Sequence, residues 1–307
     1  MPFPVYTHSA CLAHDTGPGH AERSERLASV IAALRVALPD LEWREAPRAS
    51  RGQLLRVHDE ALLHAVLETA PHARMWLDPD TVLSPQSPEA ALRAAGAVVA
   101  AVDHALSGDA QTPRAFCAVR PPGHHATGEV AMGFCLFNSI AVGAAHALER
   151  YGLRRVAIVD FDVHHGNGTQ AIFEREPRVL FASSHQMPLY PDTGHPSERG
   201  VGNIFNAALP PDADGRLFRD TWATRLLPQI DGFKPQLVMI SAGFDAHERD
   251  PLAQLRLQAE DFGWITAELV AIAERHAGGR IVSTLEGGYD LQGLSASCVA
   301  HVTALRN

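Results

Sequence analysis

Two carboxylates and an imidazole stand at alternate positions in one short run of the chain. They are Asp160, Asp162 and His164, in the run Asp-Phe-Asp-Val-His. In an extended chain, side chains two residues apart project to the same side. We therefore expect one face to carry three groups that bind a divalent cation, and Asp245, in a Gly-Phe-Asp turn, to add a further carboxylate. Such a set leaves a coordination position open for water, as a catalytic metal requires.

A hydrogen-bonded polar pair that caps a strand is the simpler interpretation of an isolated Asp-x-His motif. Three carboxylates buried together without a cation, however, would hold like charges close together at low dielectric constant, which costs several kcal/mol. A divalent ion removes this repulsion, so we favour a metal site. The ligand types do not distinguish Zn²⁺ from Mn²⁺ or Fe²⁺.

The adjacent histidines His124 and His125 are a second source of chemistry. A Pro-Pro-Gly turn at 121–123 precedes them, and it fixes a rigid backbone that is not helical. Imidazole titrates near physiological pH, so one of the two suits the role of general base toward a water that a metal ion has made more acidic. The other is expected to stay protonated beside a carboxylate. For His165 and His185 we favour a role outside the chemistry, either exposure to solvent or structural hydrogen bonding.

Tyr289 follows two glycines, Gly287 and Gly288. Because glycine has no side chain, the backbone can approach its neighbours closely there. The phenol hydroxyl could then point into the same site and donate a hydrogen bond to an oxyanion. By itself, Gly-Gly-Tyr predicts only a turn.

Short apolar and β-branched runs are typical of buried parallel strands. Five such runs cover residues 115–119, 156–161, 179–182, 237–241 and 281–285. Helical spacing is found at 87–106, 138–151, 217–230 and 258–276. For the first of these helices, Ser87 is the expected N-cap and Pro88 the first helical residue. The alternation of strands and helices predicts an α/β fold with a doubly wound, mainly parallel sheet.

The unusual polar residues follow directly after these strands. The segments concerned are 120–125, 160–167, 183–185, 243–245 and 286–289. Ligands of open α/β sheets bind at the carboxyl ends of the strands. We therefore expect five segments that are distant in sequence to meet in one crevice.

Composition limits the class of protein. The chain has 307 residues, 46% of them apolar and 20% charged, which is enough for a large core. No linker or repeat divides it, so we expect one domain over 1–307. The formal net charge of −9 repels a phosphate backbone and argues against direct binding to nucleic acid.

The same sequence carries no targeting or membrane signal. The N-terminal residues lack the basic and apolar regions of a signal peptide, and no run of 18 apolar residues follows. We expect a cytoplasmic protein that does not bind membranes. The four cysteines have no C-x-x-C spacing, which argues against a thiolate metal site and against a disulfide framework.

Taken together, these segments resemble the histone deacetylase superfamily, which includes bacterial histone deacetylase-like amidohydrolases and acetylpolyamine amidohydrolases. The likeness runs from the motif His-Asp-Thr-Gly-Pro-Gly-His at 14–20 to Tyr289. It implies an arginase-like, three-layer α/β fold with one catalytic Zn²⁺. The zinc ligands of the family match Asp162, His164 and Asp245, the set already indicated by the residues themselves.

The resemblance also implies catalytic roles. His124 and His125 match the general acid/base pair, Asp160 matches the carboxylate behind His124, and Tyr289 matches the residue that polarises the scissile carbonyl. Asn167 stands where some members carry an Asp behind the second histidine. Without a charged partner, His125 should be the more easily neutral base.

A substrate tunnel is the next implication of the resemblance. Gly133 and Phe134, with Tyr190 opposite, match the residues that enclose the linear stem of the substrate, and Leu252 matches its apolar rim. This sequence departs from the family at two positions. Tyr190 stands where Phe is frequent, which adds a polar edge, and Ser139 replaces a common Asn or Asp.

Two further sites follow from the same resemblance. Members carry a structural monovalent cation, usually K⁺, whose ligands match Asp160, Asp162, His164, Ser183 and Ser184. Arg23 matches an arginine that lines an internal cavity for the acetate product.

We therefore expect a zinc-dependent deacetylase that hydrolyses N-acyl amides of lysine side chains or related linear amines. An acetylpolyamine amidohydrolase is the alternative, although Leu252 stands where a dedicated polyamine enzyme would place an acidic gatekeeper. A manganese ureohydrolase would need ligands for a second ion, and a non-catalytic acyl-amine sensor would not need Tyr289. The sequence leaves acyl length and a homo-oligomer open.

Overall fold

The computed structural model describes residues 3–69, 71–108 and 112–307. Its large sheet consists of β1 (Pro4–Thr7), β2 (Glu42–Glu45), β5 (Arg114–Cys117), β6 (Val156–Asp160), β7 (Val179–Gln186), β8 (Ile204–Leu209), β9 (Leu237–Ala242) and β10 (Ile281–Leu285). The strand order is β2-β1-β5-β10-β9-β6-β7-β8, and all neighbours are parallel. A separate antiparallel pair joins β3 (Met75–Trp76) to β4 (Val82–Leu83).

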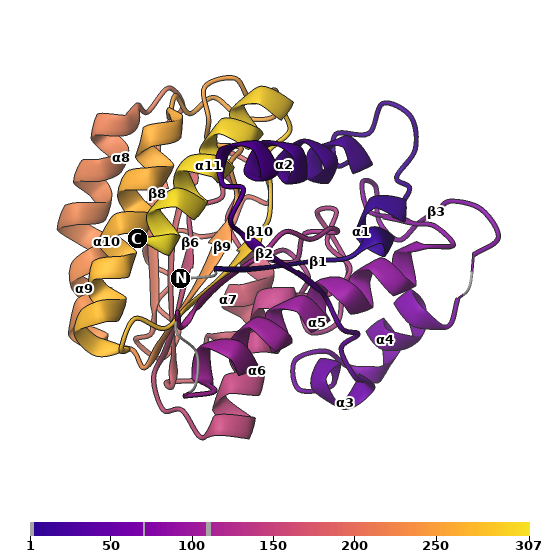
Figure 1. Ribbon diagram of the computed structural model, residues 1–307, viewed down its shortest axis with the longest axis horizontal. Helices are drawn as coiled ribbons and strands as arrows, with labels where there is room; N and C mark the ends of the chain where they lie inside the picture. The colour runs from indigo at the N-terminus through magenta and orange to yellow at the C-terminus, as the bar shows by residue number, and fades with distance from the viewer. Residues whose placement is uncertain (1–2, 70, 109–111) are drawn as a thin grey trace.

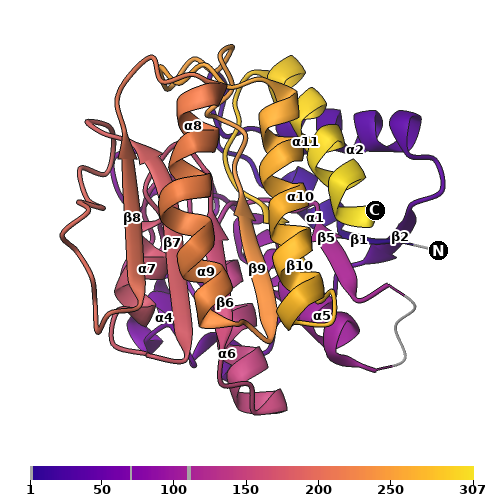
Figure 2. The same cartoon turned by 90° about the vertical axis from the view of Figure 1, so that its left-hand side faces the viewer.

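Helices cover both faces of the large sheet (Figures 1 and 2). One face carries α2 (Ser24–Ala37), α8 (Gly215–Thr221), the π-helical turn η1 (Trp222–Leu226), α9 (Leu227–Phe233), α10 (Ala259–His276) and α11 (Leu291–Arg306). The other carries α3 (Arg51–Leu54), α4 (Glu60–Leu67), α5 (Ser87–Leu106), α6 (Ser139–Tyr151) and α7 (Asn167–Phe173). The short helix α1 (Ser9–Ala13) contacts both α2 and α5. The α/β fold with a mainly parallel sheet is confirmed.

The strands β6 and β9 are apolar along most of their length because both sheet faces are covered. In β6, residues 156–159 are completely buried, and the same holds for 237–240 in β9. This is the pattern of a parallel sheet between two helical layers. These continuous apolar runs are the reason that the strands could be predicted from the sequence.

Three strands of the sheet escaped the sequence analysis: β1, β2 and β8. The strands β2 and β8 lie at the two edges of the sheet. β2 has the sequence Glu-Trp-Arg-Glu, and its residues remain partly or fully exposed. β1 has only four residues and begins at Pro4. Neither β1 nor β2 carries the continuous apolar signal on which the prediction depended.

The prediction that Ser87 caps α5 is wrong. The helix begins at Ser87, and its N-cap is Gln86. The Ser87 hydroxyl instead lies 2.7 Å from the Ser84 backbone N and 2.8 Å from Nδ1 of His14. It is therefore engaged in fixing the preceding turn. By contrast, Asn138 caps α6 by accepting a 3.0 Å hydrogen bond from the Ala141 N–H.

The sheet order explains how distant segments reach one place. The strands β5, β10, β9, β6 and β7 are consecutive neighbours, and since all are parallel, their carboxyl ends lie along one edge. These are the strands that the sequence analysis singled out. The prediction for β7 was too short, because the strand continues to Gln186, so 183–185 lie within it rather than after it.

Two further observations concern the described residues. None of their helices is long and apolar enough to cross a membrane. All four cysteines are buried and free, so the sequence argument against disulfides is confirmed. The assignment of 1–307 to a single domain stays a prediction.

The buried histidine His58 makes stability sensitive to acid. Its Nε2 accepts the Asn138 N–H at 2.9 Å, and its Nδ1 donates to the Thr127 carbonyl at 2.9 Å, so the ring must be neutral. Burial lowers the pKa of His58 to about 4, below the value of about 6.5 in an unfolded chain. Its contribution is therefore complete above pH 6.5 and is lost as the pH falls toward 4, by up to about 3 kcal/mol.

We expect His58→Gln to unfold at lower urea than the wild type at pH 7.5, with a smaller further loss at pH 5. Urea titrations of both proteins at the two pH values measure this difference. An equal pH dependence in the variant and the wild type would contradict the prediction.

Candidate active site

Three buried side chains converge at the carboxyl end of the sheet. Asp162, His164 and Asp245 each offer a donor atom, and these atoms lie within 4.8 Å of one another. Nδ1 of His164 is 3.1 Å from Oδ1 of Asp162 and 3.2 Å from Oδ2 of Asp245. For metal–ligand bonds of about 2.0 Å, the edges of a tetrahedron measure about 3.3 Å. The donor set thus fits a small divalent ion with a fourth position open.

The chain reaches this arrangement by bending, and the predicted extended conformation is wrong. β6 ends at Asp160, and the residues after it form bends. The N–H of Asp162 donates to Oδ1 of Asp160 (3.1 Å), and that of His164 donates to Oδ1 of Asp162 (2.9 Å). The N–H of Val163 reaches Oδ1 of Asp245 at 2.9 Å. The carboxylates organise the turn, and the turn brings the ligands to one side.

Gly287 leaves room for the two carboxylates. A Cβ atom at this position would stand 2.0 Å from Oδ2 of Asp245 and 2.5 Å from Oδ2 of Asp162. The Gly287 N–H also donates to Oδ2 of Asp162 at 2.8 Å. A side chain at position 287 would displace both carboxylates, so this position requires glycine.

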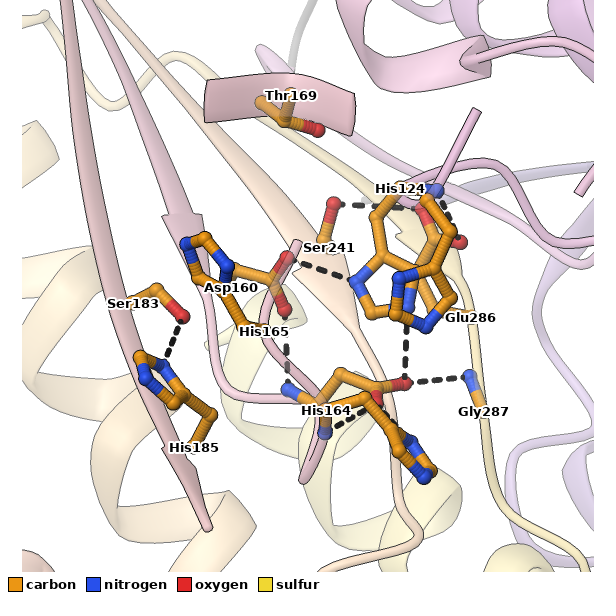
Figure 3. A network of polar contacts seen from close by, with 12 residues as sticks. His124, Asp160, His164, His165, Thr169, Ser183, His185, Ser241, Glu286 and Gly287 are labelled. Carbon is orange, nitrogen blue, oxygen red and sulfur yellow. Dashed lines mark hydrogen bonds and ion pairs between the residues drawn. The ribbon is translucent and has the colours of Figure 1, made fainter. Parts of the chain in front are cut away.

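The histidine pair has two different partners, of which Figure 3 shows that of His124, the carboxylate of Asp160. Nδ1 of His124 lies 2.9 Å from Oδ2 of Asp160, and Nδ1 of His125 lies 2.7 Å from Oδ1 of Asn167. The two ring centroids are 4.0 Å apart. Because an amide oxygen accepts the Nδ1 proton of His125, the Nε2 of that ring keeps its lone pair.

Environment separates the pKa values of the two rings. Burial alone would lower the pKa of His124, but the carboxylates of Asp162 and Asp160 outweigh it and raise that pKa well above its usual value. Burial, reinforced by the positive charge of His124, lowers the pKa of His125 well below its usual value. The two rings therefore favour different protonation states, a separation that acid–base catalysis commonly uses.

Tyr289 is fixed from two sides. Its N–H donates to Oδ2 of Asp250 at 2.7 Å, and the guanidinium of Arg26 lies 4.7 Å from its ring centroid. Burial raises the pKa of the phenol well above 10, so it is protonated. Among the described residues, the hydroxyl has no hydrogen-bond partner. The hydroxyl is therefore free to donate to a bound group.

The prediction for Arg23 does not agree with the structure. Its side chain is 39% exposed and lies 3.8 Å from Glu25. Arg23 is the N-cap residue of α2 and points outward, whereas Arg26 shares the buried side of that helix with Leu27 and Val30. Arg26 is fully buried, donates to the backbone carbonyls of Gly288 and Glu286, and is the arginine beside the active site.

Glu22 anchors this arginine, and the sequence analysis missed it. The buried carboxylate binds Arg26 at 3.0 Å and accepts two N–H groups of Arg120. Burial raises the pKa of Glu22, but the two guanidinium groups outweigh it and bring the value down to about 2. The sequence held no clear signal for this pair, because Glu22 precedes α2 and the rule for i,i+4 pairs applies within a helix.

Of the expected substrate-tunnel residues, Gly133, Phe134 and Tyr190 lie beside His125 or Tyr289. A Cβ atom on Gly133 would stand 2.5 Å from the ring of His125. The ring centroid of Tyr190 is 5.2 Å from that of His125, and the centroid of Phe134 is 5.8 Å from that of Tyr289. Leu252 is 36% exposed, and its N–H donates to Asp250.

The residues expected to hold a monovalent cation are only partly together. Asp160 pairs in register with Ser183 across β6 and β7. The hydroxyl of Ser183 lies 3.0 Å from Nδ1 of His185, and that of Ser184 accepts the Trp222 Nε1–H at 3.0 Å. The Ser184 side chain therefore points away, and only its backbone remains available.

Of the two roles expected for His165 and His185, the structure shows hydrogen bonding and not exposure to solvent, since both rings are buried. Their ring centroids are 4.8 Å apart. His165 contacts Thr193 and Gln170, and Nε2 of His185 lies 3.0 Å from the Gly194 carbonyl. The two rings thus anchor the loop that carries Tyr190.

Comparison with known proteins places this geometry in a family. The profile described as Histone deacetylase domain matches residues 20–305. A histone deacetylase-like amidohydrolase of Pseudomonas aeruginosa is 40% identical over 88% of this chain and 73% of the relative. A probable deacetylase of Archaeoglobus fulgidus is 38% identical over 94% of this chain and 82% of the relative. The crystal structure of the HDA15 HD domain, 34% identical, matches 99% of this chain and 88% of that chain with a TM-score of 0.92. The chain therefore belongs to the histone deacetylase family.

Proposed function

We propose that the protein is a zinc-dependent deacetylase that hydrolyses N-acyl amides of lysine side chains or related linear amines. The observation that carries this proposal is the set of donor atoms from Asp162, His164 and Asp245 beside two histidines with different partners. Deacetylases and amidohydrolases among the relatives support a hydrolytic reaction.

Each side chain then has a defined task. A divalent ion held by the Asp-His-Asp group would supply Lewis-acid chemistry, polarising the acyl carbonyl and making water more acidic. His125, neutral beside Asn167, would take the proton from the attacking water, and His124, charged beside Asp160, would protonate the departing amine. The Tyr289 hydroxyl would donate to the developing oxyanion.

We propose that the substrate stem passes between Gly133 and Phe134 on one side and Tyr190 on the other, with Leu252 at the rim. Phe134 and Tyr190 present rings near Tyr289 and His125 respectively. An apolar, narrow path selects an unbranched chain. Leu252 offers no charge to a second amine of the substrate, which favours acyl-lysine over acylpolyamine.

The remaining assignments are also proposals. A potassium ion would use Asp160, Asp162, His164 and Ser183, with the backbone of Ser184. Arg26, rather than Arg23, would face the acetate product, since it is the buried arginine beside Tyr289. The cytoplasmic location and a homo-oligomer are proposals of the same kind.

A substrate panel tests the function. Zinc-loaded protein is incubated with acetyl-lysine peptides, longer acyl-lysine peptides and acetylpolyamines, and released acid and free amine are measured. We expect turnover of acyl-lysine with a preference over acetylpolyamine. A folded, zinc-loaded protein that leaves the whole panel intact would refute the proposal. About two manganese ions per chain, with urea released from a guanidino substrate added to the panel, would favour a ureohydrolase instead.

A further inference from the structure

Glu286 is a buried carboxylate next to the candidate active site, and the chemistry proposed above does not use it. Its Oε2 accepts the backbone N–H of Gly123 at 2.6 Å and that of His124 at 3.2 Å. Its Oε1 lies 3.3 Å from the hydroxyl of Ser241. Figure 3 shows the Glu286 carboxylate between Ser241 and His124. The side chain thus holds the loop that carries the histidine pair.

The residues after Glu286 connect the same point to the metal ligands and to Tyr289. The Gly287 N–H donates to Oδ2 of Asp162, and the Glu286 carbonyl accepts a hydrogen bond from Arg26. The Glu286 N–H donates to the Ala242 carbonyl at the end of β9. One short segment therefore bonds to the histidine loop by its side chain and to the ligand Asp162 by its backbone, and it continues into Tyr289.

Stability does not explain a carboxylate at this position. Glu286 is 1% exposed, and among the described residues no side-chain nitrogen of lysine, arginine or histidine lies within 4.0 Å of its oxygens. A buried carboxylate without an ion-pair partner is costly, and an apolar side chain would remove that cost. What the carboxylate adds is an oxygen of fixed position, Oε2, that accepts two adjacent backbone N–H groups at once, while Oε1 faces the Ser241 hydroxyl.

We propose that Glu286 is a positioning residue for the deacylation reaction: its carboxylate fixes the backbone of Gly123 and His124 and so sets the place of the histidine pair relative to Asp162 and Tyr289. This inference rests on the proposed function. The bonds to Gly123 and His124 hold the loop at the two residues where the chain turns from Pro-Pro-Gly into the pair. A shift of about 1 Å in such groups costs about 100-fold in rate.

Two substitutions of Glu286 distinguish the effect of its hydrogen-bond geometry from the effect of its negative charge. Glu286→Gln keeps one oxygen for both N–H groups, and its NH₂ can donate to the Ser241 hydroxyl. Glu286→Leu has a similar volume but leaves both N–H groups without an acceptor. For the zinc-loaded proteins we expect kcat on an acyl-lysine peptide to fall about 100-fold in Glu286→Leu, with KM and zinc content within about threefold of the wild type. Glu286→Gln should recover most of kcat.

A readout independent of turnover accompanies the kinetics. Hydrogen exchange of the segment 120–126 should speed up in Glu286→Leu, while that of 156–164 stays as in the wild type. Asp261→Leu is the matched control, because it removes another buried carboxylate that accepts a backbone N–H, from Gln258 at the start of α10. It should lower stability without changing the ratio of kcat to KM.

Each outcome decides the matter. Wild-type kcat in Glu286→Leu would refute the proposal, and so would a loss in Glu286→Gln as large as that in Glu286→Leu, since the charge rather than the geometry would then be essential. If Glu286→Leu does not fold, Glu286→Ala takes its place, because water can enter the space and the same fall in kcat is expected. An inactive wild type would refute the proposed function instead and is recognised before any variant is compared.

Discussion

Replacing Asp245 by asparagine is expected to remove the metal ion from the protein and to lower deacylase activity by about 1,000-fold or more. Asp245 is fully buried, and its Oδ2 faces Nδ1 of His164 at 3.2 Å. An asparagine keeps the size of the side chain but loses the negative charge that a divalent ion requires. Lewis-acid stabilisation of several kcal/mol is lost with the ion, which corresponds to this change in rate.

Asp245→Asn is a better test of metal binding than a substitution of Asp162, because the Asp245 carboxylate accepts fewer hydrogen bonds from the backbone. Asp162 accepts the N–H groups of both His164 and Gly287, so its replacement would disturb the turn itself. Among the backbone N–H groups that the structure describes, Asp245 accepts only that of Val163, through Oδ1. The amide oxygen of the substituted side chain can keep that bond, and the fold should survive.

The measurements are metal content per chain and acid release from an acyl-lysine peptide. Chelation of the wild type should abolish turnover, and added Zn²⁺ should restore it, whereas Asp245→Asn should stay inactive at the same Zn²⁺ concentration. Asp103→Asn, a substitution on α5 that changes an acid bonded to His146 and Tyr151, is the control for loss of a carboxylate elsewhere. A variant that keeps one ion and full activity would remove Asp245 from the ligand set.

The central strands could be predicted from the sequence because buried strands consist mainly of apolar residues. The strands β6, β9 and β10 are apolar along most of their length, and each ends directly before a polar segment. Position in the chain and the rule for parallel sheets were enough to bring His124, Asp162, Asp245 and Tyr289 together. That juxtaposition does not depend on the details of any loop.

The same reasoning could not predict the conformation of the loops or their hydrogen bonds. Alternation along the run 160–164 indicated that Asp162 and His164 share one side, but the cause is a bend stabilised by carboxylate-to-N–H bonds. Such bonds also join residues from different strand ends, as Val163 and Asp245 show. No local pattern in the sequence records them.

The sequence analysis also failed to predict which charged side chains are buried. Arg26, Glu22 and Glu286 are fully or almost fully buried, although charged side chains are normally solvated. The contacts of Glu22 with Arg120 and of Arg26 with Gly288 and Glu286 span 98, 262 and 260 positions of the chain. Arg23 was assigned from the family resemblance alone, and the sequence did not show that Arg26 is the arginine on the buried side of α2.

Replacing Tyr289 by phenylalanine is expected to lower kcat by about 100- to 1,000-fold, with KM and metal content close to the wild type. The substitution removes only the hydroxyl, which has no partner among the described residues, and keeps the ring beside Arg26. Folding should therefore be unaffected. The loss arises because one fixed donor to the oxyanion contributes about 3–4 kcal/mol in the transition state and little in the ground state.

Steady-state kinetics on an acyl-lysine peptide measure this split, with Tyr151→Phe as the matched control. The Tyr151 hydroxyl, on α6, bonds to Asp103 and takes no part in the site, so its loss should leave kcat unchanged. A Tyr289→Phe variant with wild-type kcat would mean that the phenol only lines the pocket. If KM alone rose, the hydroxyl would bind substrate in the ground state, and the oxyanion donor would have to be sought elsewhere. The expected fall in kcat alone also separates an enzyme from an acyl-amine sensor, because a sensor has no transition state for the hydroxyl to stabilise.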